Sequence, residues 1–342
     1  MTQTLEEFME GSEPGPEGPP RRRRTRKVLR GRTSIRRGRI DRRFVTMMVI
    51  AAIGLGLVLY PQAADWFSSI SHNSQLSGYA QDVEQLDPSA RTKVLDRARE
   101  YNSRIPAGQL RDPYSTQAPT PALEGQLKDY QSQLNVANDE VIGRLRYPSL
   151  NIDLPIFHGT SDDVLAKGVG HLYGSSLPVG GPGTQSVLTS HSGIPNAELF
   201  TPLHSAKIGD IFSTEVMDHT FLYKVNKIEV VKPDDISSLK VVAGEDQITL
   251  ITCTPIGVNS HRLLVHASRI ADIPKDAPEQ KTLAGRQTNI GFPFWAVYFI
   301  GGLLAFYLAP AILRYAQGPR HREHPVKSAS RAPLRKYSKT AS

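Results

Sequence analysis

Two long apolar runs constrain this 342-residue chain more than any other feature of its sequence. The first extends from Phe44 to Tyr60 and the second from Ile290 to Leu313, and neither contains a charged residue. Each is close to the ~20 residues that a helix needs to cross a bilayer. We therefore expect membrane-spanning helices at residues 44–62 and 290–313, with a single folded domain between them.

The formal net charge of +8 is concentrated in two basic segments beside these runs. Residues 21–43 hold thirteen Arg or Lys against one acidic residue, and residues 314–342 hold eight against one. Since Lys and Arg are retained on the cytoplasmic side, both tails are expected inside and the intervening domain outside. The sequence thus predicts a two-pass protein of the cell membrane with both termini in the cytoplasm.

Other interpretations of the N-terminal region stay open. Residues 44–60 could be the core of a cleaved signal peptide, with small residues for cleavage at Pro61-Gln-Ala-Ala64. Arg42-Arg43-Phe44 also resembles a twin-arginine signal. The basic run of residues 21–43 could bind nucleic acid, but it lacks interleaved aromatic side chains, so we expect no nucleic-acid partner.

The remaining segments outside the central domain are expected to be tails, a stalk and a linker. Residues 1–43 and 314–342 are predicted to be tails, the first of them disordered because it is rich in Glu, Gly, Pro and Arg. Residues 63–140 should form a helical stalk and a proline-rich loop, and residues 274–289 a polar linker. Within the stalk region, the helical stretches are predicted at Ala64–Tyr101 and Leu123–Leu134.

Residues 141–273 show a β pattern. Gly, Pro, Asn and Asp separate seven short apolar or alternating runs, at Ile142–Tyr147, Ile152–Phe157, Gln185–Thr189, Ile211–Glu215, Phe221–Val231, Gln247–Cys253 and Arg262–Arg269. Only short helical turns fit between them, near Ser161–Ala166 and Ala197–Leu203. Several short strands with turn signals predict a mainly β domain, either a sandwich or a closed barrel.

The only cysteine, Cys253, stands at the end of one of these predicted strands. Strand side chains alternate between faces, so Thr249, Ile251 and Cys253 share one face. The turn residues that follow suggest that the next strand brings Arg262 back beside the sulfur. A thiol and a fixed cation at adjacent strand ends form a candidate reaction centre.

Cysteine chemistry outside the cell leaves three interpretations open: a reactive thiol, an intermolecular disulfide, or a small buried hydrophobe. A cysteine nucleophile needs a proton-transfer partner, normally histidine. Among ten histidines, His191 is the best placed, because it ends a β run at a Gly/Pro turn, where functional side chains are often displayed. His261 should face away from Cys253 if Arg262 faces it.

These residues resemble the sortase family. Thr249-Leu-Ile-Thr-Cys253 matches the sortase pattern Thr-Leu-x-Thr-Cys, Arg262 follows at the usual distance, and His191 lies in the matching His-x-Gly turn. The neighbouring segments Gly168–Leu172 and Ser176–Gly181 are also similar. The resemblance covers about residues 141–269 and is closest to the class C, pilin-polymerising sortases. Those carry an Asp-Pro-aromatic lid motif and a second membrane helix, to which Asp112-Pro113-Tyr114 and residues 290–313 correspond.

The resemblance implies a cysteine transpeptidase on an eight-stranded sortase barrel. The Cys253 thiolate would cleave a Leu-Pro-x-Thr-Gly-like sorting signal between Thr and Gly, Arg262 would stabilise the oxyanion, and His191 would protonate the leaving amine. The acceptor amine would be a pilin lysine or, in wall anchoring, a peptidoglycan precursor. Tyr114 would cover Cys253 as a lid, with Asp112 paired to Arg262.

Two further expectations follow. An unperturbed Cys pKa of ~8.5 leaves little thiolate at neutral pH, and a nearby Arg262 should favour the thiolate. Cys253 and the distant histidines lack zinc-ligand spacing, and no phosphate loop or dinucleotide motif is present, so we expect no required cofactor or metal. Some sortases bind calcium, which the acidic domain does not exclude. The alternative from a different functional class is a non-catalytic protein that uses the same barrel for binding only.

Overall fold

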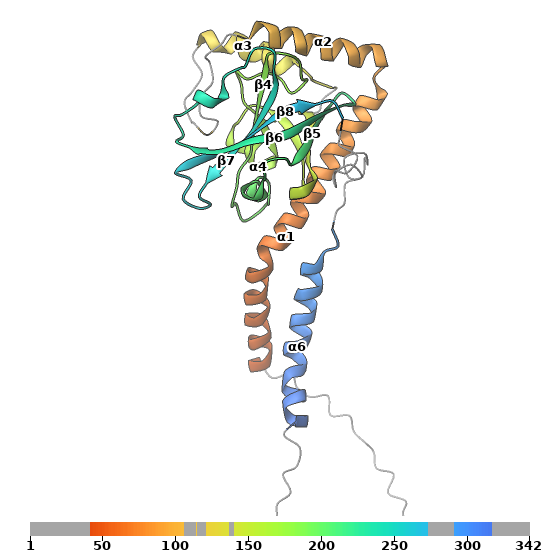
Figure 1. The fold of residues 1–342 in the computed structure, drawn as a ribbon. Helices are drawn as coiled ribbons and strands as arrows, with labels where there is room; N and C mark the ends of the chain where they lie inside the picture. The colour runs from red at the N-terminus through yellow and green to blue at the C-terminus, as the bar shows by residue number, and fades with distance from the viewer. Residues whose placement is uncertain (1–41, 106–113, 115–120, 137–139, 273–290, 317–342) are drawn as a thin grey trace, which may run out of the picture. The chain divides into compact units, whose positions relative to one another are not determined.

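The computed structural model describes residues 42–105, 114, 121–136, 140–272 and 291–316, with the side chains of 121–125 and 313–316 left out. The α-helices in this part of the chain (Figure 1) are α1 (Arg42–Gln85), α2 (Pro88–Arg104), α3 (Pro121–Ser132), α4 (Asp162–Lys167) and α6 (Phe294–Ala316). Two of them, α1 and α6, are long and apolar enough to cross a membrane.

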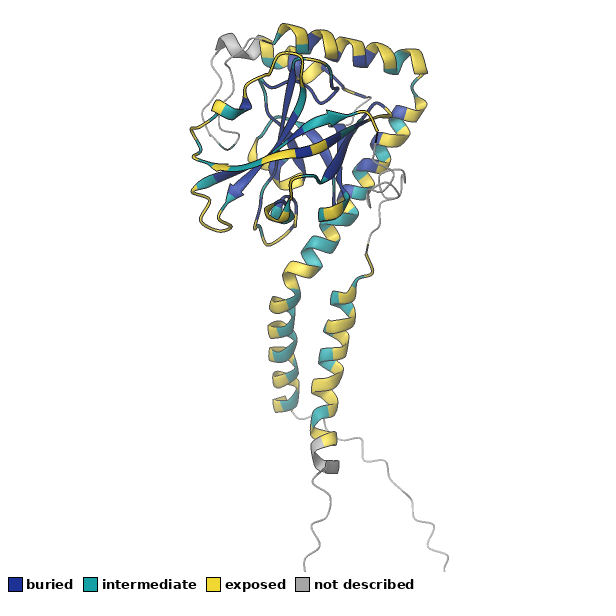
Figure 2. Cartoon of the chain, in the orientation of Figure 1, coloured by how far each residue is buried: buried dark blue, intermediate teal, exposed yellow. Residues whose placement is uncertain are grey.

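Eight strands close into a barrel in the order β1-β2-β3-β4-β7-β8-β6-β5. Their bounds are β1 Val141–Tyr147, β2 Ile152–His158, β3 Val169–His171, β4 Thr184–Thr189, β5 Ile211–Val216, β6 His219–Val231, β7 Asp246–Thr254 and β8 His261–Ile270. Most neighbours are antiparallel, but β2 pairs with β3, and β4 with β7, in parallel. The closed eight-stranded barrel that the resemblance implied is confirmed, and most residues of its strands are buried (Figure 2).

Two local differences from the sequence prediction have clear causes. The three-residue strand β3 was not among the predicted runs, because Val169-Gly170-His171 is too short to show alternation. The stalk, predicted as one stretch from Ala64 to Tyr101, is divided between α1 and α2. Pro88 starts α2 at a position where a missing backbone N–H costs nothing. The turn near Ala197–Leu203 is a short 3-10 helix at Thr201–Ser205.

Helix α1 continues from the apolar segment onto the barrel wall. One face of its outer half is buried there, with His72, Leu76, Tyr79 and Val83. The Tyr79 hydroxyl donates to the Ile142 carbonyl at 3.3 Å and accepts from the Met217 amide at 3.0 Å. A buried hydroxyl with two backbone partners fixes the rotation and height of the helix against β1 and the β5–β6 turn.

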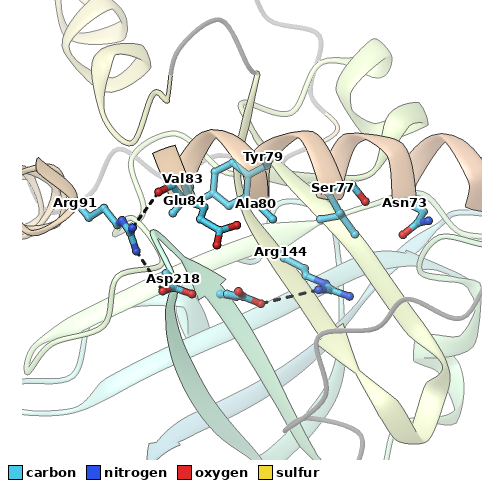
Figure 3. Close-up of a pocket in the computed structure, with 11 residues that line it drawn as sticks. Asn73, Ser77, Tyr79, Ala80, Val83, Glu84, Arg91, Arg144 and Asp218 are labelled. Atoms are coloured by element: carbon cyan, nitrogen blue, oxygen red, sulfur yellow. Dashed lines mark hydrogen bonds and ion pairs between the residues drawn. The ribbon is translucent and has the colours of Figure 1, made fainter. Parts of the chain in front are cut away.

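Between α1 and the barrel lies a cavity of about 310 Å³ (Figure 3). Four of its charged groups form two pairs: Arg91 of α2 binds Asp218 at 3.3 Å, and Arg144 lies 4.0 Å from Glu215. Arg144 also binds Asp153 through two nitrogens, at 2.7 and 2.6 Å. Neither Cys nor His lines this cavity. It therefore belongs to the joint between helix and barrel, apart from the predicted reaction centre.

Tyr130 anchors α3 on the barrel. Its hydroxyl lies 2.9 Å from both the Nδ1 and the carbonyl oxygen of His171 and accepts from the Gly159 amide at 3.0 Å. The His158 ring packs edge-on against Tyr130, with centroids 4.7 Å apart. Burial lowers the pKa of both histidines to about 4, so each is neutral at neutral pH. These histidines are structural, which is the role expected of buried neutral imidazoles.

Acid should destabilise this anchor. The folded pKa of His158 and His171 is below their unfolded value of ~6.5, so the unfolded state binds more protons and stability falls as pH drops from ~6.5 towards about 4. We expect the free energy of unfolding in detergent to decrease across this window, and less steeply in His171→Gln. The exposed His204→Gln should match the wild type. An equally steep loss in His171→Gln would contradict this account.

Candidate active site

Cys253 and Arg262 are direct cross-strand partners at the end of the β7–β8 ladder. Both are largely buried, with 7% and 8% of their surface exposed. The Arg262 Nη1 donates to the carbonyl oxygens of Asn259 and His261, at 3.1 and 3.2 Å. The strand pairing and these loop carbonyls hold the cation on the same face as the thiol, while His261 pairs with Thr254 one position further along.

His191 reaches the same level through the parallel pairing of β4 and β7. Thr189 pairs with Ile251, and the next residue continues the ladder with a Ser190 N–H to Ile251 carbonyl bond of 3.3 Å. Ser192 Oγ then donates to the Cys253 carbonyl at 2.8 Å. His191 lies between these contacts, so the chain carries it past the strand end beside Cys253. The Phe200 amide donates to the His191 carbonyl and closes the following loop.

The imidazole of His191 is half-buried. Burial lowers its pKa from the ordinary value, and the charge of Asp162 at the start of α4 acts in the opposite direction. Because burial is the larger effect, the neutral form is favoured at neutral pH more than in a solvated histidine. Such a group can accept a proton and return it within one reaction cycle.

Tyr114 covers this centre. Its ring lies 4.8 Å from the Arg262 guanidinium carbon and 5.8 Å, centroid to centroid, from the His191 ring. Its hydroxyl donates to the Ser190 carbonyl at 2.7 Å and accepts from Thr189 Oγ1 at 2.8 Å. Burial raises the pKa of Tyr114, and the nearby Cys253 raises it further, so the phenol stays protonated.

An apolar floor continues from the centre along the same outer face of the barrel. Its buried members are Leu172, Val187, Leu239, Ile251 and Leu264, and Tyr114 packs against them. Ile251 and Leu264 are the pair next to Cys253 and Arg262 on this face. An extended peptide reaching Cys253 along this face would therefore meet aliphatic side chains once Tyr114 had moved.

The structure brings together His191, Cys253, Arg262 and Tyr114 from β4, β7, β8 and the stalk region. Asp112 lies outside the described residues, so its pairing with Arg262 stays a prediction. Sequence reasoning missed Thr189, whose hydroxyl donates to the Tyr114 hydroxyl, and Ser190, whose carbonyl accepts from it. Their position just before His191 in the strand was the available signal. Within the described residues, no group of three His, Cys, Asp or Glu side chains could hold a metal ion.

The comparisons with known proteins decide the family. The sortase domain model matches residues 145–270, which include the three residues that converge here. The crystal structure of sortase C-1 from Actinomyces oris is 44% identical, with a TM-score of 0.51, over 54% of this chain and all of that one. The chain belongs to the sortase family. The resemblance inferred from the Thr249–Cys253 motif is thereby confirmed.

Other relatives refine the placement of this sortase. Streptococcus agalactiae sortase C1 in complex with MTSET is 40% identical, with a TM-score of 0.53, over 58% of this chain and 98% of that one. Streptococcus agalactiae Sortase A is 30% identical over 140 residues, which is 40% of this chain and 56% of the relative. The match thus spans little more than half of that curated protein. Similarity to several sortase C structures supports class C, and the family members compared are cysteine transpeptidases.

Proposed function

We propose that this sortase is a membrane-anchored class C transpeptidase. It cleaves a Leu-Pro-x-Thr-Gly-like sorting signal between Thr and Gly and transfers the acyl group to an amine, which in pilus assembly is a lysine of a pilin subunit. The observation that carries the proposal is the convergence of His191, Cys253 and Arg262 at one end of the barrel. Thiol, imidazole and guanidinium are the three groups that this chemistry requires.

The first half-reaction forms a thioester. The neutral His191 imidazole takes the proton of the Cys253 thiol, and the resulting thiolate attacks the Thr carbonyl carbon. The carbonyl electrons move onto oxygen, where the fixed charge of Arg262 stabilises them. When the C–N bond breaks, the leaving Gly amine takes a proton from the His191 imidazolium. The second half-reaction reverses these roles: an acceptor amine attacks the thioester, His191 removes its proton, and the Cys253 thiolate leaves.

Burial supports this chemistry. Cys253 and Arg262 are both nearly excluded from solvent, so the attraction between a thiolate and the guanidinium is screened less than at a surface. Tyr114 contributes to that exclusion, but it also occupies the face along which a sorting signal must enter. We therefore assign Tyr114, together with Asp112, to a lid that moves aside before the peptide binds.

The pilin acceptor is favoured over wall attachment by three features. These are the similarity to sortase C structures, a second helix able to span a membrane, and the aromatic residue over the reaction centre. One of those structures, sortase C from Streptococcus pneumoniae, is described in connection with pilin substrate specificity and is 37% identical. Attachment of surface proteins to peptidoglycan, or binding without turnover, are the alternative functions.

The proposed arrangement in the cell follows from the basic tails. Residues 44–62 and 290–313 cross the membrane, residues 1–43 and 314–342 stay in the cytoplasm, and the catalytic domain of residues 141–273 is extracellular. Residues 63–140 form the stalk and lid, and residues 274–289 return the chain to the second helix. In this arrangement the catalytic domain and its substrates lie on the same side of the membrane, facing the cell wall.

Trapping the acyl-enzyme tests the reaction itself. Incubation of the full chain with a sorting-signal peptide should add the mass of the peptide up to Thr to Cys253, and hydroxylamine should release it. Cys253→Ala should acquire no such mass. A non-catalytic scaffold would bind the peptide without forming the adduct. High-molecular-weight pilin ladders, lost on deletion of the gene, would separate pilus assembly from wall attachment.

Arg262 should be required for turnover. Removing one oxyanion donor typically slows a reaction by ~10²–10³, so we expect a loss of that order in kcat/KM for Arg262→Ala, and a large loss in Arg262→Lys, which lacks the planar fork. His261→Ala is the matched control, since the adjacent side chain pairs with Thr254 instead. Wild-type turnover in Arg262→Ala would rule out the assigned role.

Opening the lid should expose the thiol. In an Asp112→Gly, Tyr114→Ala double variant, we expect a thiol reagent to modify Cys253 several times faster than in wild type, because the ring over the centre is gone. Tyr173→Ala, which removes a partly exposed tyrosine elsewhere on the domain, should leave the rate unchanged. Equal rates in the double variant and wild type would contradict a covering role for Tyr114.

A further inference from the structure

Aromatic side chains mark the level at which the two long helices leave the membrane. Trp66 and Phe67 of α1 pack against Trp295 of α6, with centroids 6.2 and 5.8 Å from it. The Trp66 indole donates to the Gly291 carbonyl at 2.8 Å. Counted from Phe44, the ~20 residues that span a bilayer end just before Asp65, and Trp residues gather at membrane interfaces. Residues 65–67 therefore lie at the outer interface.

The loop that follows His191 is tied to this level. The Glu198 amide donates to Asp65 Oδ1 at 2.7 Å. Further along α1, Tyr79 contacts the Ile142 carbonyl and the Met217 amide, and α2 then binds Asp218 through Arg91. The contacts of α1 thus run from the His191 loop, at Asp65, to the β5–β6 turn, which meets the helix further from the membrane at Tyr79. Cys253 and His191 lie at the membrane-proximal ends of β7 and β4.

At this same end, the β7–β8 loop exposes two aliphatic side chains. Val258 is 69% exposed and Ile256 is 46% exposed. Ile256 also packs against Gly193 in the His191 loop: Gly193 has a φ of +71°, and a Cβ there would collide with the Ile256 side chain. The apolar tip is therefore joined, through Gly193 and Glu198, to the residue of α1 that meets the membrane surface.

We propose that the β7–β8 loop rests on the outer leaflet of the bilayer through Val258 and Ile256. The occupant is the lipid surface because the loop sits at the end of the barrel that Asp65 holds at the interface. Apolar side chains at this level gain by entering the boundary between headgroups and acyl chains. The reaction centre then opens at the membrane surface, where the sorting signal of a membrane-held protein would lie.

This proposal rests on the membrane topology given above and not on the transpeptidase reaction. It concerns only the position of one end of the barrel relative to the bilayer, so it can be tested in a catalytically inactive variant. The presence of a single native cysteine makes site-specific labelling direct. Val241 is a control of similar exposure in a different loop: it is 55% exposed and lies between the end of β6 and the start of β7.

The experiment places a nitroxide at Val258→Cys or Val241→Cys in the full-length Cys253→Ala chain, reconstituted in phosphatidylcholine–phosphatidylglycerol vesicles. Oxygen concentrates in lipid and a neutral nickel chelate stays in water, so the ratio of their collision rates reports depth. We expect that ratio to be severalfold higher at 258 than at 241. A label at Ile256→Cys should give a similar ratio to the label at Val258→Cys. This second site controls for a local perturbation caused by one substitution.

Two outcomes would overturn the proposal. Equal ratios at 258 and 241 would place the loop in water. Protection of the 258 label from both oxygen and the chelate would mean that protein, such as a second copy of the chain, covers the loop. Acyl-enzyme formation in the Cys253 chain is measured separately, so a failure of the membrane contact and a failure of the transpeptidase assignment are distinguishable.

Discussion

The parallel pairing of β4 with β7 is the interaction on which the rest of this sortase depends. Its register places Thr189 opposite Ile251, so the two strands end at the same level. His191 and Cys253, which are far apart in the sequence, are thereby delivered side by side, and the antiparallel β8 adds Arg262. A shift of one residue in either ladder would turn a reactive side chain to the other face of the barrel.

Burial then sets the chemical character of these groups. It lowers the pKa of His191, keeps the Tyr114 phenol protonated, and places Arg262 where its charge acts on Cys253 with little screening. In the proposed lid, the same Tyr114 that shields the centre moves aside before a peptide uses the apolar floor beside Ile251 and Leu264. On this proposal, one side chain both shields the centre from water and blocks the path of the peptide.

Helix α1 connects this centre to the apolar segment that is proposed to cross the membrane. A single continuous helix carries the apolar segment, the aromatic residues at its outer boundary, and the face that docks on the barrel. Because the Asp65 and Tyr79 side chains bond to backbone groups of the loop behind His191 and of β1, these contacts set the height and tilt of the domain against the helix. With the proposed topology, these contacts would set the position of the reaction centre relative to the bilayer.

The sequence by itself determined the family, the β class and the two candidate spans, because these depend on local sequence patterns. It also determined the convergence of Cys253 with Arg262, because a short loop joins their two strands. The order in which the strands pair, the three-residue β3 and the partners of Tyr114 needed the tertiary structure. The strand order depends on long-range pairing, and Thr189 and Ser190 contact a residue about seventy-five positions away. No periodic pattern in the sequence predicts such contacts, because the packing of the complete barrel determines which distant residues meet.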